Sequence, residues 1–209
     1  MCGRYVVTNP VSKTKKLVKS AIQVEDNENY NAHPNQKLPV IKKYKNGNTL
    51  ENLKWGLLPS WAKDKDFKSL INARLETIDE KVSFKKLIKD FRCVAIADGF
   101  YEWKREDKKK IPYYFIRQDK KPIFIAAIFE NDQFCLITEE AKENIRSIHH
   151  RQPVILNHTD INRYLNLGLL GSGFLKECKK PDLIFHEVSK DVNIPTNNTA
   201  SLIQNVSNN

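Results

Sequence analysis

Short apolar runs separated by polar segments fill the middle of the chain, and they constrain its fold more than any other feature. Runs of about four to eight residues rich in β-branched and aromatic side chains are typical of strands, and two such runs around a polar turn predict a hairpin. The first two runs flank the charged segment Lys104–Lys110, and the next two meet at Asn131-Asp132. The predicted strands are Arg92–Trp103, Ile111–Arg117, Ile123–Glu130, Gln133–Thr138 and Leu183–Ser189.

Helical patterns are fewer and shorter. Thr77–Asp90 begins with a capping-box pattern, in which Thr77 is followed by Glu80, and a helix here would place Val82, Leu87 and Phe91 near one apolar face. Glu140–Ile148 and Thr159–Leu167 predict two further short helices, the second with a threonine as its N-cap. Strands joined mainly by hairpins, with helices added around them, indicate an α+β fold with a mostly antiparallel sheet. One domain is expected for 209 residues.

The charge balance favours a polyanionic partner. The chain carries 35 Lys and Arg against 25 Asp and Glu, which gives a formal net charge of +10. Such a surplus does not determine the fold, but it biases association toward nucleic acid or other polyanions. A solvated, lysine-rich surface with no such partner would have the same composition.

Several classes of protein are disfavoured by the sequence. The longest apolar run, Ile123–Phe129, is far shorter than the roughly 20 residues that span a bilayer, and no signal peptide is visible. The four cysteines, Cys2, Cys93, Cys135 and Cys178, show no C-x-x-C pair and no ligand-like spacing with histidine. We therefore expect no membrane partner, no disulfide framework, no metal and no cofactor, in a reducing cytoplasm.

The start of the chain offers an unusual reactive group. Methionine aminopeptidase normally removes Met1 when a residue as small as Cys2 follows it. The mature chain would then carry an α-amine and a thiol on one residue, and the amine, with a reference pKa of about 8, is partly uncharged near neutral pH. The amine can condense with an aldehyde to an imine, and the thiol can close on the imine carbon to form a thiazolidine. Alternatively, Cys2 could be the N-terminal nucleophile of an amide hydrolase.

Several motifs occur in an order that closely resembles the SRAP family, named SOS response-associated peptidases and understood as abasic-site crosslinking proteins. The resemblance extends from residue 2 to about residue 205, and it implies one domain with a barrel-like, mostly antiparallel β core surrounded by short helices. The motifs are MCGRY at the start, WGLLPSWAKD (Trp55–Asp64), NARLET (Asn72–Thr77), ADGFYEWK (Ala97–Lys104), HHRQPVIL (His149–Leu156) and VSKDVN (Val188–Asn193).

The resemblance implies four catalytic residues. Cys2 is the covalent residue, and Asn72 holds the N-terminal residue and the sugar in place. Glu102 is the acid and base, set among aromatic neighbours that would keep its carboxyl partly protonated. His149 begins the H-x-R-x-P pattern and suits proton transfer near neutral pH, although the adjacent His150 leaves that assignment open.

The expected DNA-binding residues are arginines and tryptophans. The resemblance implies that Arg4, Arg74 and Arg151 hold the phosphates beside the lesion, where guanidinium groups bind bidentately. Trp55 and Trp61 are expected to stack against bases, at about 1–3 kcal/mol for each stack. Ordinary structural roles compete with these predictions, and core packing is the usual fate of a tryptophan.

Three functions are compatible with these residues. The leading one is an enzyme that crosslinks itself through Cys2 to abasic sites in single-stranded DNA, with an associated lyase-like strand cleavage. It would act as a monomer in the DNA damage response, in the cytoplasm and on the nucleoid if the source is bacterial. A Cys2-dependent peptidase or amidohydrolase is the second, and would release product from peptides without an aldehyde. A non-covalent binder of single-stranded nucleic acid is the third, and its affinity would not depend on Cys2.

Overall fold

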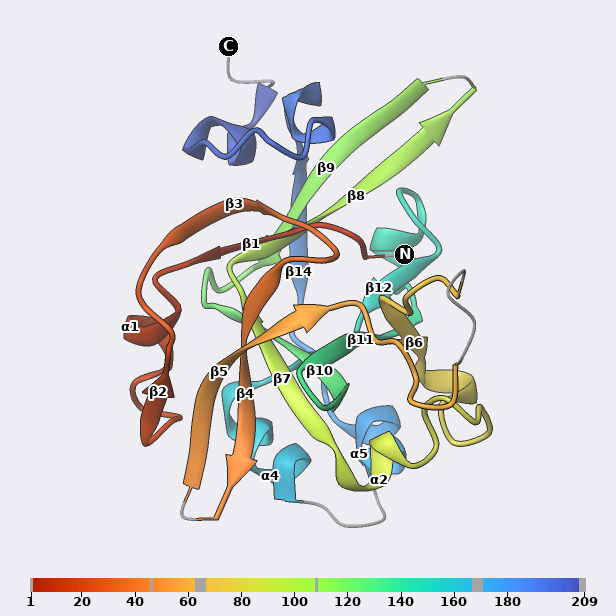
Figure 1. Ribbon diagram of the computed structural model, residues 1–209. Coiled ribbons are helices and arrows are strands. Elements are labelled where there is room, and N and C mark those ends of the chain that lie inside the picture. Colours follow the sequence, from red (N-terminus) through yellow and green to blue (C-terminus); the bar gives the residue numbers. More distant parts are fainter. Residues whose placement is uncertain (1, 46, 63–66, 108, 167–170, 207–209) are drawn as a thin grey trace.

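Antiparallel pairing between strands builds most of the molecule, and many of the paired strands are far apart in the chain (Figure 1). The computed structural model describes residues 2–45, 47–62, 67–107, 109–166 and 171–206. The predicted α+β fold class is confirmed, with strands in two sheets and short helices around them. None of the helices in these ranges has both the length and the apolarity needed to cross a bilayer.

The larger sheet closes on itself. The strands β11, β10, β7, β4 and β5 pair in that order, and each of these pairs is antiparallel. An odd number of alternating strands cannot close with antiparallel pairs alone, and the closing pair of β5 with β11 is indeed parallel. The nine strands are β12 (Arg151–Pro153), β11 (Gln133–Glu140), β10 (Ile123–Glu130), β7 (Arg92–Ala97), β4 (Lys37–Tyr44), β5 (Gly47–Trp55), β2 (Ser20–Ile22), β13 (Ile155–Leu156) and β6 (Asn72–Arg74).

The smaller sheet extends from this ring and carries the longest hairpin. β8 and β9 pair from Phe100 with Phe115 to Glu106 with Lys109, so the expected hairpin is confirmed, and its strands extend further into the charged tip than predicted. The hairpin projects away from the ring in Figure 1. In order across the sheet, the five strands are β14 (Leu183–Glu187), β9 (Lys109–Arg117), β8 (Gly99–Glu106), β1 (Tyr5–Thr8) and β3 (Glu28–Ala32).

The prediction of one strand over Arg92–Trp103 is wrong. The chain leaves the larger sheet at the end of β7 and enters the smaller sheet at Gly99. A Cβ atom at Gly99 would lie 2.4 Å from the backbone oxygen of Phe115 and 2.5 Å from the ring of Tyr114, so a side chain does not fit at this crossing. The absence of a side chain allows the two sheets to share one continuous segment.

The helices are shorter than the sequence predicts. Most of Thr77–Asp90 consists of successive turns, and Val82, expected on the buried face, is 67% exposed. Glu140 ends a strand, so the second helix starts later than expected, and Leu167 lies outside the described residues.

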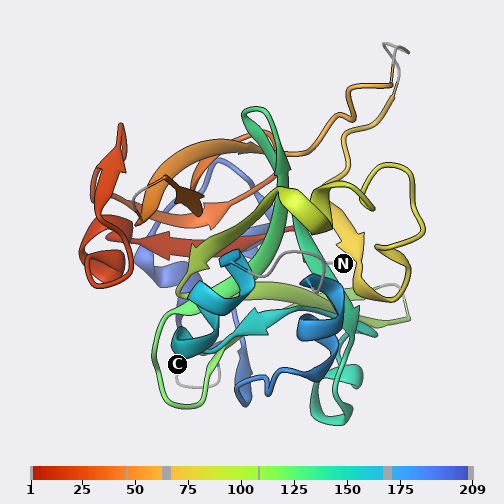
Figure 2. The same cartoon turned by 90° about the horizontal axis from the view of Figure 1, so that it is seen from below.

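From below, α2, α4 and α5 lie on the near side of the ring (Figure 2). The helices are α1 (Pro10–Thr14), α2 (Leu87–Asp90), α3 (Glu143–Arg146), α4 (Ile161–Asn166) and α5 (Gly171–Glu177), with 3-10 turns η1 (Leu75–Thr77), η2 (His158–Asp160), η3 (Lys190–Asn193) and η4 (Ala200–Ile203).

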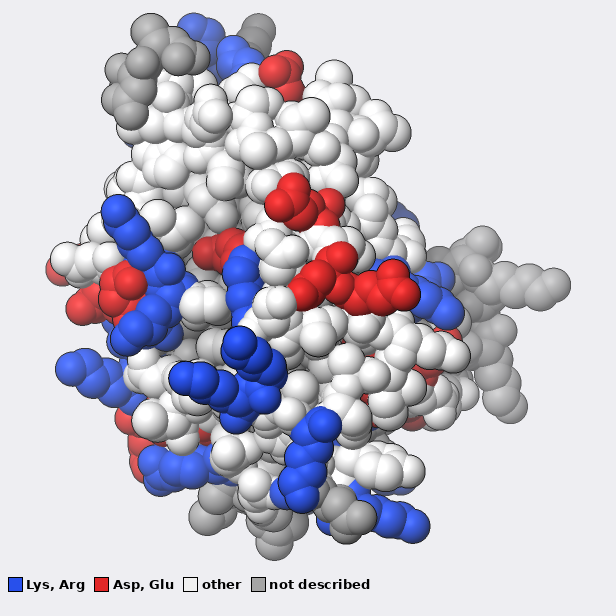
Figure 3. All heavy atoms as spheres, turned by 90° about the vertical axis from the view of Figure 1, so that its left-hand side faces the viewer, with Lys and Arg blue, Asp and Glu red and all other residues white. Residues whose placement is uncertain are grey.

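Basic side chains are spread over the face that carries α1 and β2. Figure 3 shows this face, on which Lys and Arg side chains gather in the lower half and acidic side chains lie between and above them. Lys15, Lys16 and Lys19 are exposed in this region. The surplus of positive charge is therefore only partly concentrated here, and the acidic neighbours reduce the local potential.

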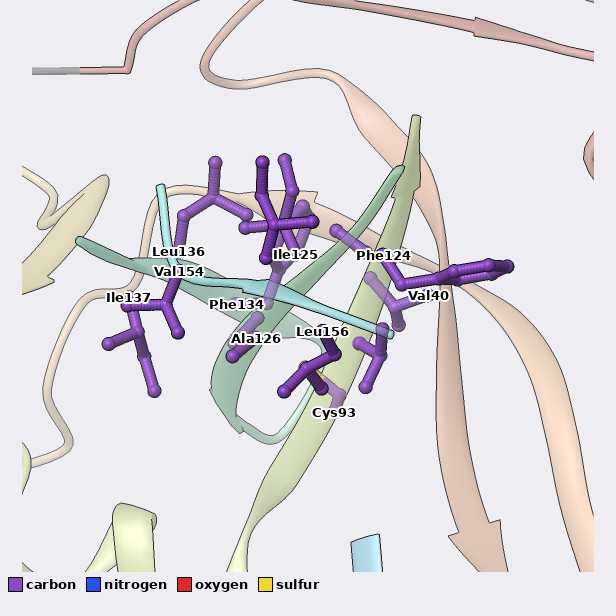
Figure 4. Packing of buried hydrophobic residues seen from close by; sticks show 14 of the residues in the cluster. Val40, Cys93, Phe124, Ile125, Ala126, Phe134, Leu136, Ile137, Val154 and Leu156 are labelled. Carbon is purple, nitrogen blue, oxygen red and sulfur yellow. The ribbon is translucent and has the colours of Figure 1, made fainter. Parts of the chain in front are cut away.

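The interior of the ring holds the main apolar core. Side chains from β4, β7, β10 and β11 gather in one cluster in Figure 4, among them Val40, Cys93, Ile125 and Leu136. Ile125 has no exposed surface. A second, smaller cluster packs the face of the β8–β9 hairpin against the C-terminal segment; it is formed by Val6, Tyr101, Tyr114, Val188, Val192 and Leu202.

Trp55 belongs to the core, and the expectation that it stacks on DNA bases is wrong. Its side chain has no exposed surface, its ring centroid lies 5.1 Å from that of Tyr5, and its indole nitrogen donates to the Ile71 carbonyl at 2.9 Å. Trp61 is 50% exposed and meets Phe67 edge-to-face, with ring centroids 5.6 Å apart. Of these two tryptophans, Trp61 is therefore the one accessible to a base.

The two tryptophans offer a matched test of this difference. We expect Trp55→Ala to lower the free energy of unfolding by about 3–5 kcal/mol, because it leaves a large cavity in the core. Trp61→Ala should cost less than about 1 kcal/mol, because half of that side chain is already in water. Urea denaturation followed by circular dichroism measures both, and equal losses would contradict the assignment of Trp55 to the core.

Candidate active site

Backbone pairing holds the start of the chain against β8. Tyr5 pairs with Phe100, and the Tyr101 N–H donates to the Arg4 carbonyl at 2.9 Å. Because this pairing is antiparallel, the residues before Arg4 continue along β8 toward Glu102. Cys2 lies there with no exposed surface.

Asn72 holds Cys2 from the other side. It begins β6, which pairs in parallel with β11, and its Nδ2 donates to the Cys2 carbonyl at 2.9 Å. Its Oδ1 is buried and accepts no hydrogen bond from any described residue. A buried amide oxygen without a donor is costly, so Oδ1 is an available acceptor beside Cys2.

Glu102 and His149 lie together, with 3.8 Å between Glu102 Oε1 and His149 Nδ1. Burial raises the pKa of Glu102 to about 7, and burial lowers the pKa of His149 to about 4. Near neutral pH, the carboxyl is therefore about half protonated and the imidazole is uncharged, so the contact is not an ion pair. Two groups whose environments shift their pKa values in opposite directions are suited to acid and base roles.

The backbone of Arg151 orients the imidazole. The Arg151 N–H lies 3.0 Å from His149 Nδ1. His149 Nδ1 also lies 3.1 Å from the Arg151 carbonyl oxygen, so the Arg151 backbone holds this side of the ring whether Nδ1 accepts or donates.

The Cys2 thiol is uncharged at neutral pH. Burial raises its pKa, and the nearby Glu102 carboxylate raises it further. A thiolate nucleophile usually needs a positive neighbour that lowers the pKa. This cysteine is therefore unlike the activated cysteine of a thiol hydrolase.

The two adjacent histidines face different pockets. The helix predicted over Glu140–Ile148 ends at Arg146, before both histidines, and the rings of His149 and His150 lie 4.5 Å apart between centroids. His149 lines a first pocket of about 460 Å³, and His150 lines a second of about 390 Å³. The first pocket is lined by Arg4, Glu102, Trp103, Arg105, Lys110, His149 and Asn193, and the second by Arg74, Glu140, Arg146, His150 and Arg151.

The three arginines expected to hold phosphates differ in whether their guanidinium groups are already hydrogen-bonded within the protein. Arg74 is exposed at the second pocket. Arg4 donates from Nη1 to Asn31 Oδ1 at 2.6 Å and to the Val192 carbonyl at 2.9 Å, while its Nε is buried and has no hydrogen-bond partner among the described residues. Through these hydrogen bonds the Arg4 side chain stabilises the fold, and it also lines the first pocket.

Arg151 is engaged within the protein. Its guanidinium donates to both carboxylate oxygens of Glu76, at 2.8 and 2.9 Å, and to the Thr138 carbonyl at 2.7 Å. Its side chain is only 6% exposed. A phosphate at Arg151 would have to replace or share the Glu76 carboxylate, so its phosphate-binding role stays a prediction.

The four predicted catalytic residues are brought together, but their neighbours Glu76, Arg105, Lys110 and Asn193 were not predicted as site residues. Glu76 lies inside the NARLET motif, and the spacing of Arg105 and Lys110 around the expected hairpin turn could have placed them opposite each other. Asn193 ends the VSKDVN motif, for which no role at the site was predicted. In the described ranges, no three His, Cys, Asp or Glu side chains lie close enough to hold a metal ion.

The opposite shifts of Glu102 and His149 predict opposite effects of pH on stability. The folded carboxyl, with its pKa raised to about 7, binds more protons than in the unfolded chain, so its contribution is complete below about pH 4.3 and is lost as the pH rises through 7. The folded imidazole, with its pKa lowered to about 4, contributes above about pH 6.5 and loses that contribution as the pH falls through 4.

We therefore expect the stability of Glu102→Gln, relative to that of the unsubstituted protein, to increase as the pH rises from about 4.5 to 7. The relative stability of His149→Gln should decrease as the pH rises from about 4 to 6.5. The slopes should not exceed about 1.4 kcal/mol per pH unit. Urea titrations at several pH values measure the differences. Two variants that keep a constant offset from the unsubstituted protein would contradict these protonation states.

Comparisons with known proteins identify the family of this chain. Residues 1–195 match the family model described as SOS response associated peptidase (SRAP). The abasic site processing protein YoaM of Bacillus subtilis is 36% identical over 97% of this chain and 97% of its own, and the abasic site processing protein YedK of Escherichia coli is 31% identical over 99% and 100%. A solved structure of a protein from Bacteroides thetaiotaomicron has the same fold, with a TM-score of 0.82 and 22% identity over 98% of this chain and 99% of its own. The chain therefore belongs to the SRAP family.

Proposed function

We propose that this protein processes abasic sites in single-stranded DNA by forming a covalent crosslink through Cys2. The names of its relatives, abasic site processing proteins, support the substrate. The observation that carries the chemistry is the grouping of Cys2 with Asn72, Glu102 and His149. Removal of Met1 turns the Cys2 amide nitrogen into an amine and so supplies the missing nucleophile.

The protonation states support each step. An abasic deoxyribose is mostly a closed hemiacetal, and opening it transfers a proton to the ring oxygen while the hydroxyl on C1′ loses one. A carboxyl with a pKa of about 7 is protonated often enough to donate, and neutral His149, 3.8 Å away, is placed to relay the other proton. The product is an aldehyde at C1′.

The capture releases one water. The Cys2 amine attacks C1′, and the resulting carbinolamine loses its oxygen as water after Glu102 returns a proton, which leaves an imine. The neutral thiol then adds to the imine carbon, forming the S–C bond while its proton passes to the nitrogen. A five-membered thiazolidine results, with no further reactant. Because an imine acidifies the adjacent carbon, lyase-like strand cleavage can compete before the ring closes.

The surroundings support a single strand as the partner. Arg74 is exposed at the second pocket, and Trp61 is half exposed and free to stack on a base. All four cysteines are free thiols, as a reducing cytoplasm would keep them. We propose that the protein acts there as a monomer in the DNA damage response.

A Cys2-dependent peptidase is the second candidate, because the family model is described as a peptidase. The raised pKa of the thiol disfavours it, since a cysteine nucleophile attacks amides as a thiolate. A peptidase would release product from peptides repeatedly and would need no aldehyde.

The decisive experiment mixes the protein with a single-stranded oligonucleotide that carries one abasic site. We expect a denaturation-resistant adduct whose intact mass equals protein without Met1 plus DNA minus one water. Cys2→Ala should abolish the adduct, and Glu102→Gln should slow its formation by about 10²-fold or more. Cys178→Ala is the matched control, because Cys178 is a partly exposed thiol that is not part of the site, and it should leave the rate unchanged.

An adduct that survives Cys2→Ala, or none from protein shown to lack Met1, would refute the proposal. Peptide turnover lost in Cys2→Ala, together with the absence of an adduct, would instead establish the peptidase.

A further inference from the structure

Two like charges face each other on the β8–β9 hairpin beside the active site. Arg105 of β8 and Lys110 of β9 are directly opposite cross-strand partners, and both are exposed. Like charges directly opposite on a sheet are destabilising, whereas opposite charges contribute roughly 0.2–1 kcal/mol. The fold therefore carries a small penalty at this position.

The adjacent positions of the same hairpin avoid that penalty. Lys104 and Glu106 form an ion pair at 2.5 Å, and Glu106 faces Lys109 across the hairpin. Among the described residues, neither Arg105 nor Lys110 forms an ion pair with an acidic side chain. The charges are thus balanced at one register position and left uncompensated at the next.

The uncompensated pair of Arg105 and Lys110 lies at the edge of the first pocket. Arg105 and Lys110 line this pocket together with Arg4, and Glu102, about half protonated near neutral pH, is the acidic residue among its lining residues. The positive charge of Arg105 is also felt by His149, whose pKa is lowered first by burial and in small part by this arginine. The hairpin is fixed over the pocket because Trp103 Nε1 donates to Asn193 Oδ1 at 2.7 Å.

We propose that Arg105 and Lys110 bind a backbone phosphate of the strand whose abasic nucleotide lies at Glu102 and His149. The inference rests on the proposed function, that this site receives single-stranded DNA. A phosphate between the two side chains removes their repulsion and adds charge-assisted hydrogen bonds. The strand is then held on both sides of the site, by this pair in the first pocket and by Arg74 in the second.

A backbone phosphate fits better than an acidic peptide. The two cations share a pocket with the reacting groups, so whatever occupies it must continue into the site, as the lesion-bearing strand does. Two cations on a fixed hairpin also match one phosphate without reading a base, and the binding should not depend on sequence.

Salt dependence tests the proposal directly. The affinity of intact single-stranded oligonucleotides is measured by fluorescence anisotropy at several salt concentrations for the unsubstituted protein and for Arg105→Gln/Lys110→Gln. For single strands, the slope of log K against log salt falls by about 0.7 for each phosphate charge no longer neutralised. We expect a slope shallower by about 0.7, as for one phosphate, and an affinity reduced on the order of tenfold at low salt, equally for two oligonucleotides of different sequence.

The matched control is Lys15→Gln/Lys16→Gln, which removes the same charge at the end of α1. In Figure 1, α1 lies on the opposite side of the molecule from the β8–β9 hairpin. A slope change no larger than that of this control would overturn the proposal, and so would an effect confined to one sequence. An acidic peptide that competes for the hairpin while the DNA slope stays unchanged would point to a protein partner instead and also overturn it.

Two further measurements separate the possible causes of failure. Because relief of like-charge repulsion should leave the urea midpoint of the double variant unchanged or slightly raised, a lower midpoint would show that the pair is structural and would count against the proposal. Crosslinking by the unsubstituted protein reports on the proposed function by itself. A protein that forms no adduct yet shows the expected slope change would keep the phosphate contact and lose the crosslinking chemistry.

Discussion

The short pairing of β1 with β8 is the interaction on which the site depends. Two residue pairs, Tyr5 with Phe100 and Val6 with Gly99, join these strands, and the first residues of a chain are poorly ordered unless something holds them. Contacts at both ends strengthen this short ladder. Asp98 accepts hydrogen bonds from the backbone and side chain of Thr8, each at 2.8 Å, and Asn72 holds the Cys2 carbonyl. Cys2 therefore lies three residues before a paired strand, which gives it a fixed place near Glu102.

The same burial that holds the chain start also sets the protonation of the site. Glu102 is 3% exposed, and the first-named cause of its raised pKa, of the lowered pKa of His149 and of the raised pKa of Cys2 is burial in each case. Burial disfavours the charged form of every group, so it moves acids and bases in opposite directions. An apolar setting thus gives an acid that keeps its proton, a neutral base and an uncharged thiol, at some expense in stability.

Local patterns in the sequence predicted the hairpins well and the helices poorly. The β10–β11 hairpin turns at Asn131, which adopts a positive φ of 54°, as an asparagine tolerates. The prediction of a helix over Thr77–Asp90 is wrong, because a capping-box pattern does not reveal that the Val82 side chain faces water. The grouping of Cys2, Asn72, Glu102 and His149 came from family motifs, since these residues are far apart in the chain and only sheet pairing brings them together. Trp55 was misassigned because a motif does not distinguish a core tryptophan from a stacking one.

The bond between Arg151 and Glu76 indicates how the binding energy is divided among the basic residues. A carboxylate that accepts two hydrogen bonds from a guanidinium has nearly the geometry of a phosphate, so exchanging one for the other gains little. Arg74, which lines the second pocket and has no such partner among the described residues, would gain the full contact from a phosphate. The Arg151 backbone meanwhile lies within hydrogen-bond distance of His149 Nδ1. If the proposed function holds, exposed cations at the two pockets would supply more of the attraction for the strand than Arg151, whose guanidinium is already hydrogen-bonded within the protein.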